Sequence, residues 1–142
     1  MGILKGEYQY ALDDKGRVVI PPKFRRVLGD QVVVTRGIDP CISLYSAEEW
    51  ARVEEALRRL SVKQRDVVRY MMAGAVDVVP DRQGRIVLPP HLREHAGIDR
   101  EVVVVGLGSR LEIWNRPTWQ TYLKKAAKSA PEIAEQIEEL SI

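Results

Sequence analysis

Cysteine is almost absent from this sequence, because Cys41 is the only one in 142 residues. A single cysteine excludes an intrachain disulfide, so the fold depends on a hydrophobic core. We interpret Cys41 as a small buried side chain rather than as a nucleophile. Histidine is also scarce, with two residues in the chain. We expect no bound metal and no other cofactor.

Long apolar runs are missing as well. No stretch approaches the ~20 apolar residues that are needed to span a bilayer. The first residues also lack the apolar segment of a signal peptide. No serine–histidine–aspartate arrangement, phosphate-binding loop or dinucleotide fingerprint is apparent. We therefore expect a cytoplasmic protein that has no membrane partner and is not an enzyme.

The net charge is only +2, which by itself does not indicate a nucleic-acid partner. Its distribution is more informative, because residues 1–70 carry 13 basic and 10 acidic side chains. The basic side chains concentrate between residues 15 and 26, at Lys15, Arg17, Lys23, Arg25 and Arg26. Such a local patch favours DNA binding modestly, and the alternative is an ordinary solvated face.

The chain is a tandem repeat. The segment DDKGRVVIPPKFR at 13–25 recurs without a gap as DRQGRIVLPPHLR at 81–93. Beyond a small insertion the similarity continues, as residues 32–34 match 102–104, 42–45 match 111–114, and Trp50 matches Trp119. A match of this length indicates two copies of one structural module.

Each copy predicts the same order of elements, β-β-short α-β-β. The expected strands are 8–12 and 75–79, 18–20 and 86–88, 32–35 and 102–105, and 42–45 and 111–114. Gly16 and Gly84 occupy the tight turn between the first two strands, where a positive φ is favourable. The Pro-Pro pairs end a strand and begin a short helix. Gly29 and Gly97 are expected as left-handed caps of these helices.

Longer helices are expected between and after the copies. Ser46 and Ser61 each begin a capping-box pattern, and Asn115 is expected to cap a helix in the second copy. Residues 131–140 predict a last amphipathic helix. We interpret Trp50, Trp114 and Trp119 as packing residues rather than as platforms for stacking bases. The predicted domains are a first module at 7–50, linking helices at 51–75, a second module at 76–119 and a helical tail at 120–142.

Four strands per copy make a thin sheet with long unpaired edges. Pairing the two copies with each other would remove those edges and enlarge the core. We therefore expect the modules to interlock as a pseudo-dimer instead of folding side by side.

Several motifs resemble a known family. The pattern Asp13-x-Lys15-Gly16-Arg17, followed by Pro21 and Arg25, resembles the AbrB/SpoVT superfamily of DNA-binding proteins. The duplication, the Asp-x-x-x-Arg pattern in both copies, the Gly6-Glu7-Tyr8 opening and the 107–114 segment are similar to the MraZ family, over residues 6–126. The resemblance implies an α+β fold, mainly β, in which two tandem AbrB-like swapped-hairpin modules form a pseudo-dimeric β-barrel with flanking helices.

The resemblance also implies a function. It implies a regulator of the bacterial division and cell-wall gene cluster that binds short direct repeats in that cluster's promoter, usually including its own gene. It further implies a ring-shaped homo-oligomer that associates with the nucleoid. Gln83 departs from the family pattern, which has lysine there, and this makes the second module the weaker phosphate binder. The sequence leaves open the operator, the number of protomers, the sign of regulation and whether the second module touches DNA.

The residues themselves suggest how the turns could bind duplex DNA. Arg17 follows a rigid glycine turn, and its guanidinium can grip a phosphate or a guanine edge. Asp13, four residues earlier, is expected to orient Arg17, and Asp81 to orient Arg85 in the same way. The expected DNA-binding residues are Lys15, Arg17, Lys23, Arg25, Arg26, Arg82 and Arg85. The alternative is that both ion pairs only brace their turns, and Arg25 and Arg93 could equally be structural.

Two other functions deserve tests. The sequence His91-Leu92-Arg93-Glu94-His95 matches the H-x-x-E-H pattern, in which His91 and His95 would bind zinc and Glu94 would act as the base of a hydrolase. The confined helix and the lack of a third histidine argue against this alternative. A ring or antitoxin-like interaction protein that does not bind DNA is the second alternative.

Overall fold

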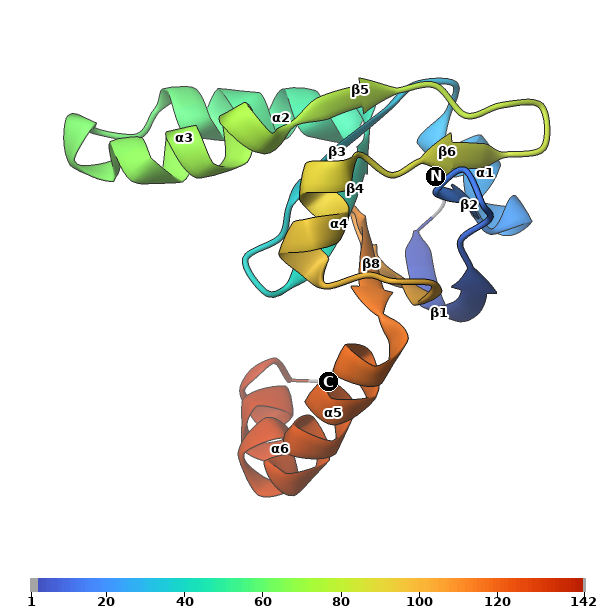
Figure 1. Cartoon of the computed structure of the whole chain (residues 1–142). Coiled ribbons are helices and arrows are strands. Elements are labelled where there is room, and N and C mark those ends of the chain that lie inside the picture. Colours follow the sequence, from blue (N-terminus) through green and yellow to red (C-terminus); the bar gives the residue numbers. More distant parts are fainter. Residues whose placement is uncertain (1–2, 142) are drawn as a thin grey trace.

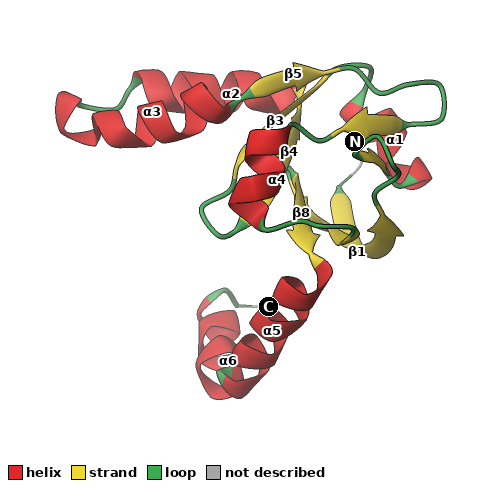
Figure 2. Ribbon diagram, viewed as in Figure 1, coloured by secondary structure: helices red, strands yellow, loops and turns green. Residues whose placement is uncertain are grey.

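The computed structural model describes residues 3–141, in which a central β body carries two projecting helical hairpins (Figures 1 and 2). The strands are β1 (Leu4–Ala11), β2 (Arg17–Val19), β3 (Val32–Arg36), β4 (Cys41–Ser46), β5 (Val76–Val78), β6 (Arg85–Val87), β7 (Glu101–Gly108) and β8 (Leu111–Asn115). The helices are α1 (Pro22–Leu28), α2 (Ala47–Arg58), η1 (Val62–Gln64), α3 (Arg65–Gly74), α4 (Pro90–Ala96), α5 (Arg116–Lys128) and α6 (Ala130–Glu139).

The two modules exchange strands. The large sheet has the order β1-β7-β8-β4-β3-β5, so the first strand of each module lies beside the other module's hairpin. β1 pairs with β7 over eight residues, whereas β5 pairs with β3 over three. The expected interlocking of the copies is therefore present in the sheet itself.

β2 and β6 form a separate antiparallel ribbon. The tight turns at Gly16 and Gly84 are present, with φ of 71° and 74°. Each turn, however, redirects the chain from one sheet to the other, so the strands on either side of it pair with the other module. The structure thus places the two turns next to the ribbon in which the modules meet.

Equivalent residues face each other where the modules meet. In the ribbon Val18 is opposite Ile86, and in the large sheet Ser43 is opposite Glu112. Both pairs join the same position of the repeat, so a pseudo-two-fold axis passes through them. Val18 and Ile86 are each 1% exposed, which places the axis in the core.

The core lies between the inner face of the large sheet, the ribbon and the short helices α1 and α4. Alternate residues of β3 and β7 face this core, and their neighbours pack on the outer face of the sheet. Trp50 of α2 and Trp119 of α5 cover that outer face, and Trp114 and Cys41 are buried there. The predicted packing roles of these aromatic residues and of Cys41 are confirmed.

The hydrogen-bonded strands remain an open sheet and a ribbon, because no ladder within residues 3–141 closes them into a barrel. The pair α2–α3 projects from one side of the β body and the pair α5–α6 from another (Figure 1). None of the described helices combines the length and apolar character needed to cross a membrane.

The helix caps follow the predictions in part. The Ser46 hydroxyl accepts a hydrogen bond from the Glu49 amide at 3.1 Å, and the capping box at Ser61 is complete, although it opens a single turn of 3-10 helix. The prediction for Asn115 is wrong, because its side-chain amide donates to the Gly97 carbonyl instead of capping α5.

The glycines after the two short helices differ from each other. Gly97 is left-handed, with φ 61° and ψ 30°, as predicted. Gly29 has φ 78° but an extended ψ of −163°, so the expected left-handed cap is wrong there. Only two residues separate Gly29 from β3, whereas the insertion leaves three between Gly97 and β7, and the shorter connection has to extend at once.

Candidate nucleic-acid interface

The outward face of the β2–β6 ribbon carries two arginines. Side chains alternate along a strand, so burial of Val18 and Ile86 turns Arg17, Val19, Arg85 and Val87 outward. Arg17 is opposite Val87 and Val19 is opposite Arg85, which sets the arginines on a diagonal across the pseudo-two-fold axis. The strand exchange thereby brings one arginine from each module onto one small surface.

Asp13 organises the first turn. One carboxylate oxygen accepts hydrogen bonds from the Lys15 and Arg17 amides, both at 2.9 Å. The other oxygen accepts from Arg17 Nε at 2.6 Å. Because only Nε is used in this contact, the terminal nitrogens of the guanidinium stay available for another partner.

Asp81 organises the second turn in the same way. Its first oxygen accepts from the Gln83 and Arg85 amides at 2.9 Å, and its second from Arg85 Nε at 2.8 Å. The predicted pairs Asp13–Arg17 and Asp81–Arg85 are therefore both present. Each carboxylate holds its arginine in one orientation, and each arginine side chain remains a quarter to a third exposed.

These contacts lower the pKa of both carboxyl groups. The pKa of Asp13 lies below its usual value of 3.8, chiefly because the Arg17 amide donates to the carboxylate. The pKa of Asp81 is lowered for the same reason by the Arg85 amide. Both carboxylates therefore keep their charge, and with it their ion pairs, to a lower pH than an ordinary aspartate would.

Two further arginines brace the turns from the opposite module. Arg25 of α1 lies against Gly84, where an added Cβ would strike its guanidinium, and its Nε donates to the Ile20 carbonyl at 3.2 Å. Arg93 of α4 lies against Gly16, and a Cβ there would come within 3.2 Å of its guanidinium. A structural role was one of the two interpretations of Arg25 and Arg93, which occupy the same position in the repeat, but their contacts with the turns of the opposite module were not predicted.

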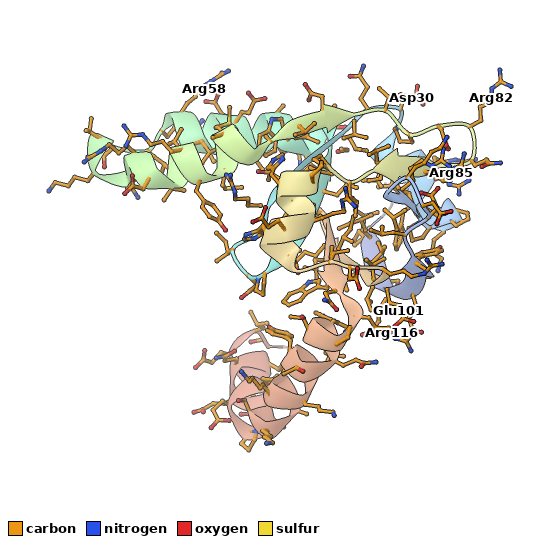
Figure 3. All side chains as sticks on the ribbon, in the orientation of Figure 1. Asp30, Arg58, Arg82, Arg85, Glu101 and Arg116 are labelled. Atoms are coloured by element: carbon orange, nitrogen blue, oxygen red, sulfur yellow. The ribbon has the colours of Figure 1, made fainter. Side chains whose placement is uncertain are left out.

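The remaining predicted residues surround the ribbon at different places. Lys15 and Arg82 are exposed at the turns, and Arg82 points away from the body at the end of the β5–β6 loop (Figure 3). Lys23 lies over the Tyr8 ring at 5.6 Å, and Arg26 is exposed in the last turn of α1. The structure thus brings Arg17 and Arg85 onto one face of the ribbon, places Lys15 and Arg82 in the adjoining turns, and leaves Lys23 and Arg26 on α1.

The histidines of α4 are engaged elsewhere. His91 Nε2 is 3.1 Å from the Gly74 carbonyl, and His95 Nε2 is 3.2 Å from the Gly37 carbonyl. The two imidazoles therefore contact different segments, α3 and the β3–β4 loop, and do not converge on one position where they could bind a zinc ion. Within residues 3–141 no cluster of three histidine, cysteine, aspartate or glutamate side chains is suited to a metal ion.

Comparison with known proteins identifies the family. A family model described as "MraZ protein, putative antitoxin-like" matches twice, over residues 3–69 and 71–139. The chain is 49% identical over 140 residues to a protein of Syntrophomonas wolfei, covering 96% of this chain and 98% of the relative. It is 43% identical over 143 residues to a protein of Caldanaerobacter subterraneus, covering 99% and 100%.

A third relative, from Kocuria rhizophila, is 48% identical over 135 residues, covering 93% of this chain and 94% of the relative. All three relatives bear the name "Transcriptional regulator MraZ". The two matches of the family model also coincide with the two copies of the repeat. The chain belongs to the MraZ family.

Proposed function

We propose that this chain is a transcription regulator that binds duplex DNA through the outward face of the β2–β6 ribbon and its two turns. The observation that supports the proposal most directly is the placement of Arg17 and Arg85. Two oriented guanidinium groups, one from each module, share a surface that is built by backbone pairing and held by carboxylates. A rigid pair of forked donors suits phosphates and guanine edges in a groove.

The other cations fit the role of backbone contacts. Lys15, Arg82 and Arg26 are exposed around the ribbon, and charges of this kind set the affinity and register of a protein on DNA. Lys23 and Arg25 stand closer to the body, where one lies over Tyr8 and the other braces Gly84. We assign these two a supporting position in the same interface.

The pseudo-dimer is the unit of recognition in this proposal. The ribbon packs on the inner face of the large sheet through Val18 and Ile86, and we propose that the two together act as one barrel-like body with a single DNA-binding end. A single such body carries little net positive charge, because the net charge of the chain is +2. Binding to several short direct repeats by a ring of protomers would raise the affinity through effective concentration, by about 10²–10⁴.

Exposed apolar side chains on the projecting helices support self-association. They include Val62, Val67, Met72, Tyr122, Leu123, Ile133, Ile137 and Leu140. Surfaces of this kind commonly mark protein–protein contacts. We propose that these helical hairpins join protomers into a ring, which leaves the ribbon free for DNA.

The proposed target is the promoter of the division and cell-wall gene cluster, including the gene of the chain itself, and the proposed location is the nucleoid in the cytoplasm. The test is a titration of the duplex immediately upstream of that gene, followed by fluorescence anisotropy, against a shuffled duplex of the same composition. Arg17→Ala and Arg85→Ala should each weaken binding to the native duplex. Arg58→Ala is the matched control, because Arg58 is an exposed arginine on α2, far from Arg85 (Figure 3).

The outcomes separate the alternatives. Equal binding of the native and shuffled duplexes would contradict sequence-specific regulation. Binding that is unchanged in Arg17→Ala and Arg85→Ala would remove the ribbon as the site and restore the view that the ion pairs only brace the turns. A folded, assembled protein that binds no duplex would favour an interaction protein without a DNA target.

A further inference from the structure

The two turns that flank the ribbon are supported unequally. In the first module the Leu12 amide donates to the Arg100 carbonyl at 2.8 Å, and the Leu12 side chain is 3% exposed. The second module has Pro80 at the equivalent position, and proline has no amide hydrogen to donate. The preceding residue, Val79, is 69% exposed and lies beyond the last rung of β5.

A cleft lies beside the second turn. It has a volume of about 320 Å³ and separates the loop 79–84 from the end of α1, around Leu28, Gly29 and Asp30. The β5–β6 loop carries its tip outward, as Figure 1 shows, and returns to the body at Gly84, which lies against Arg25. The first turn instead continues directly from β1, which is paired along its whole length with β7.

The turn tips also differ in charge. The two exposed tip residues are Asp14 and Lys15 in the first module, and Arg82 and Gln83 in the second. The carboxylates of Asp13 and Asp81 and the guanidinium groups of Arg17 and Arg85 are the same in both turns, so within the turns the difference in charge lies at the tips. The first tip is neutral, and the second carries one positive charge.

We infer that the DNA-binding surface has a polarity, and that Arg82 at the second turn is the residue that orients a protomer along the duplex. This inference rests on the proposed function. A body with true two-fold symmetry reads a palindromic site and binds equally well in both directions. Here the charge changes sign between equivalent tip positions, from Asp14 to Arg82, so the two directions place different charges beside the same phosphates.

The direction of the effect follows from simple electrostatics. In one orientation the positively charged tip with Arg82 meets a given phosphate, and in the other the neutral tip with Asp14 and Lys15 meets it and attracts it less. The projection of the second loop extends the reach of Arg82 beyond that of the first tip. Gln83 stands where the family has lysine, and this change by itself makes the second module the weaker phosphate binder. Arg82, one residue earlier, restores the positive charge that is lost there.

The test uses the buried position of Cys41. Cys41 is 0% exposed and burial raises the pKa of its thiol, so a cysteine introduced at the surface can be labelled selectively. Gln83→Cys carries a tethered iron–EDTA group at the second tip, and Arg58→Cys carries it on α2 as the control. A footprint on the upstream duplex first locates a protected segment, and cleavage by the tethered iron is then mapped on a duplex that contains one such segment.

The expected result for Gln83→Cys is cleavage at one end of the segment, stronger than at the other end by roughly tenfold. The exchange variant D14R/R82D should move the strong cleavage to the opposite end, and Arg82→Gln should make the two ends more equal. Circular dichroism confirms that each variant is folded.

The outcomes test the role of Arg82 separately from DNA binding itself. Equal cleavage at both ends with the wild-type tips, or a pattern that D14R/R82D leaves unchanged, would overturn the role of Arg82 while leaving DNA binding intact. The absence of any footprint with the unmodified protein would overturn the proposed function and the polarity together.

Discussion

Arg85 of the second module lies 4.0 Å from the carboxylate of Asp13 in the first, measured from Nη1 to Oδ2. The same oxygen already accepts a hydrogen bond from Arg17. One carboxylate therefore stands between the two arginines that the ribbon brings together. It reduces the repulsion between them and ties the turn of one module to the strand of the other.

Loss of either ribbon arginine should weaken DNA binding without unfolding the protein. Arg17→Ala and Arg85→Ala are each expected to raise the dissociation constant for the upstream duplex by about 10–100-fold, since a bidentate contact contributes ~1–3 kcal/mol. Fluorescence anisotropy measures the effect, with Arg58→Ala unchanged. A loss of helical signal or of assembly in the arginine variants would instead assign them a structural role.

Substitution of Gly84 should destabilise the fold more than substitution of Gly97. Both glycines have positive φ, so alanine at either position costs about 1–2 kcal/mol. At Gly84 the added Cβ also meets the Arg25 guanidinium, whereas at Gly97 it meets open space. Urea denaturation of Gly84→Ala and Gly97→Ala separates the two contributions, and equal losses would show that Arg25 does not brace this turn.

The stability contributed by the two turn carboxylates should depend on pH. Their pKa values are lower in the folded protein than the usual 3.8, so the folded state binds fewer protons than the unfolded state. Their contribution is therefore complete above this usual value and is lost as the pH falls through the lowered folded values. Urea denaturation from about pH 6 down to about pH 3 should show a smaller decline for D13N/D81N than for the wild type, with Asp14→Asn as the control.

Binding should also weaken steeply with salt, and the steepness should report the number of phosphate contacts. Each neutralised phosphate contributes about −0.9 to the slope of log K against log salt concentration. Removal of Arg82 or Lys15 by alanine is expected to reduce the magnitude of the slope by about one. Titrations at several salt concentrations measure it, and an unchanged slope in Arg82→Ala would show that this side chain contacts no phosphate.

The residues on the pseudo-two-fold axis should dominate the stability of the ribbon. Ile86 is 1% exposed and Val87, its neighbour on the same strand, is 50% exposed. Ile86→Ala should lower the free energy of unfolding by about 2–5 kcal/mol, because it leaves a cavity where the two modules meet. Val87→Ala is the matched control and should change stability little; a similar loss in both variants would contradict the placement of the axis.

The sequence predicted the elements better than it predicted their partners. The repeat and the turn glycines placed most strands within a few residues, although β1 begins at Leu4 rather than at residue 8. The strand character of residues 4–7 is not evident from the sequence, because β1 lies at the edge of the sheet and Lys5 and Glu7 are polar and exposed. Pairing of β1 with β7 depends on contacts between residues about a hundred positions apart, which no local pattern encodes.

The charged residues of the candidate site were predicted from the sequence, whereas the segments that Arg25 and Arg93 contact were not. The spacing of Asp13 and Arg17 is enough to suggest their ion pair, because four residues span a tight turn. The bracing by Arg25 and Arg93 depends on which module each turn faces, and that becomes clear only when the strands are exchanged. The difference between the two turns follows from Pro80. Leu12, at the equivalent position of the first module, donates its amide hydrogen to the Arg100 carbonyl, and Pro80 has no amide hydrogen to make the same bond.

The exchange of strands has a consequence for synthesis on the ribosome. When the first 70 residues have emerged, β1, β2 and β3 each still lack a partner that is encoded in the second half, namely β7, β6 and β5. The nascent chain therefore displays open strand edges until translation is nearly complete, and folding has to wait for distant segments to meet. Two incomplete chains on neighbouring ribosomes could pair through these open strand edges, because the two modules have the same elements. Slower elongation would lengthen the time in which such mispairing can occur and lower the yield of correctly paired protein.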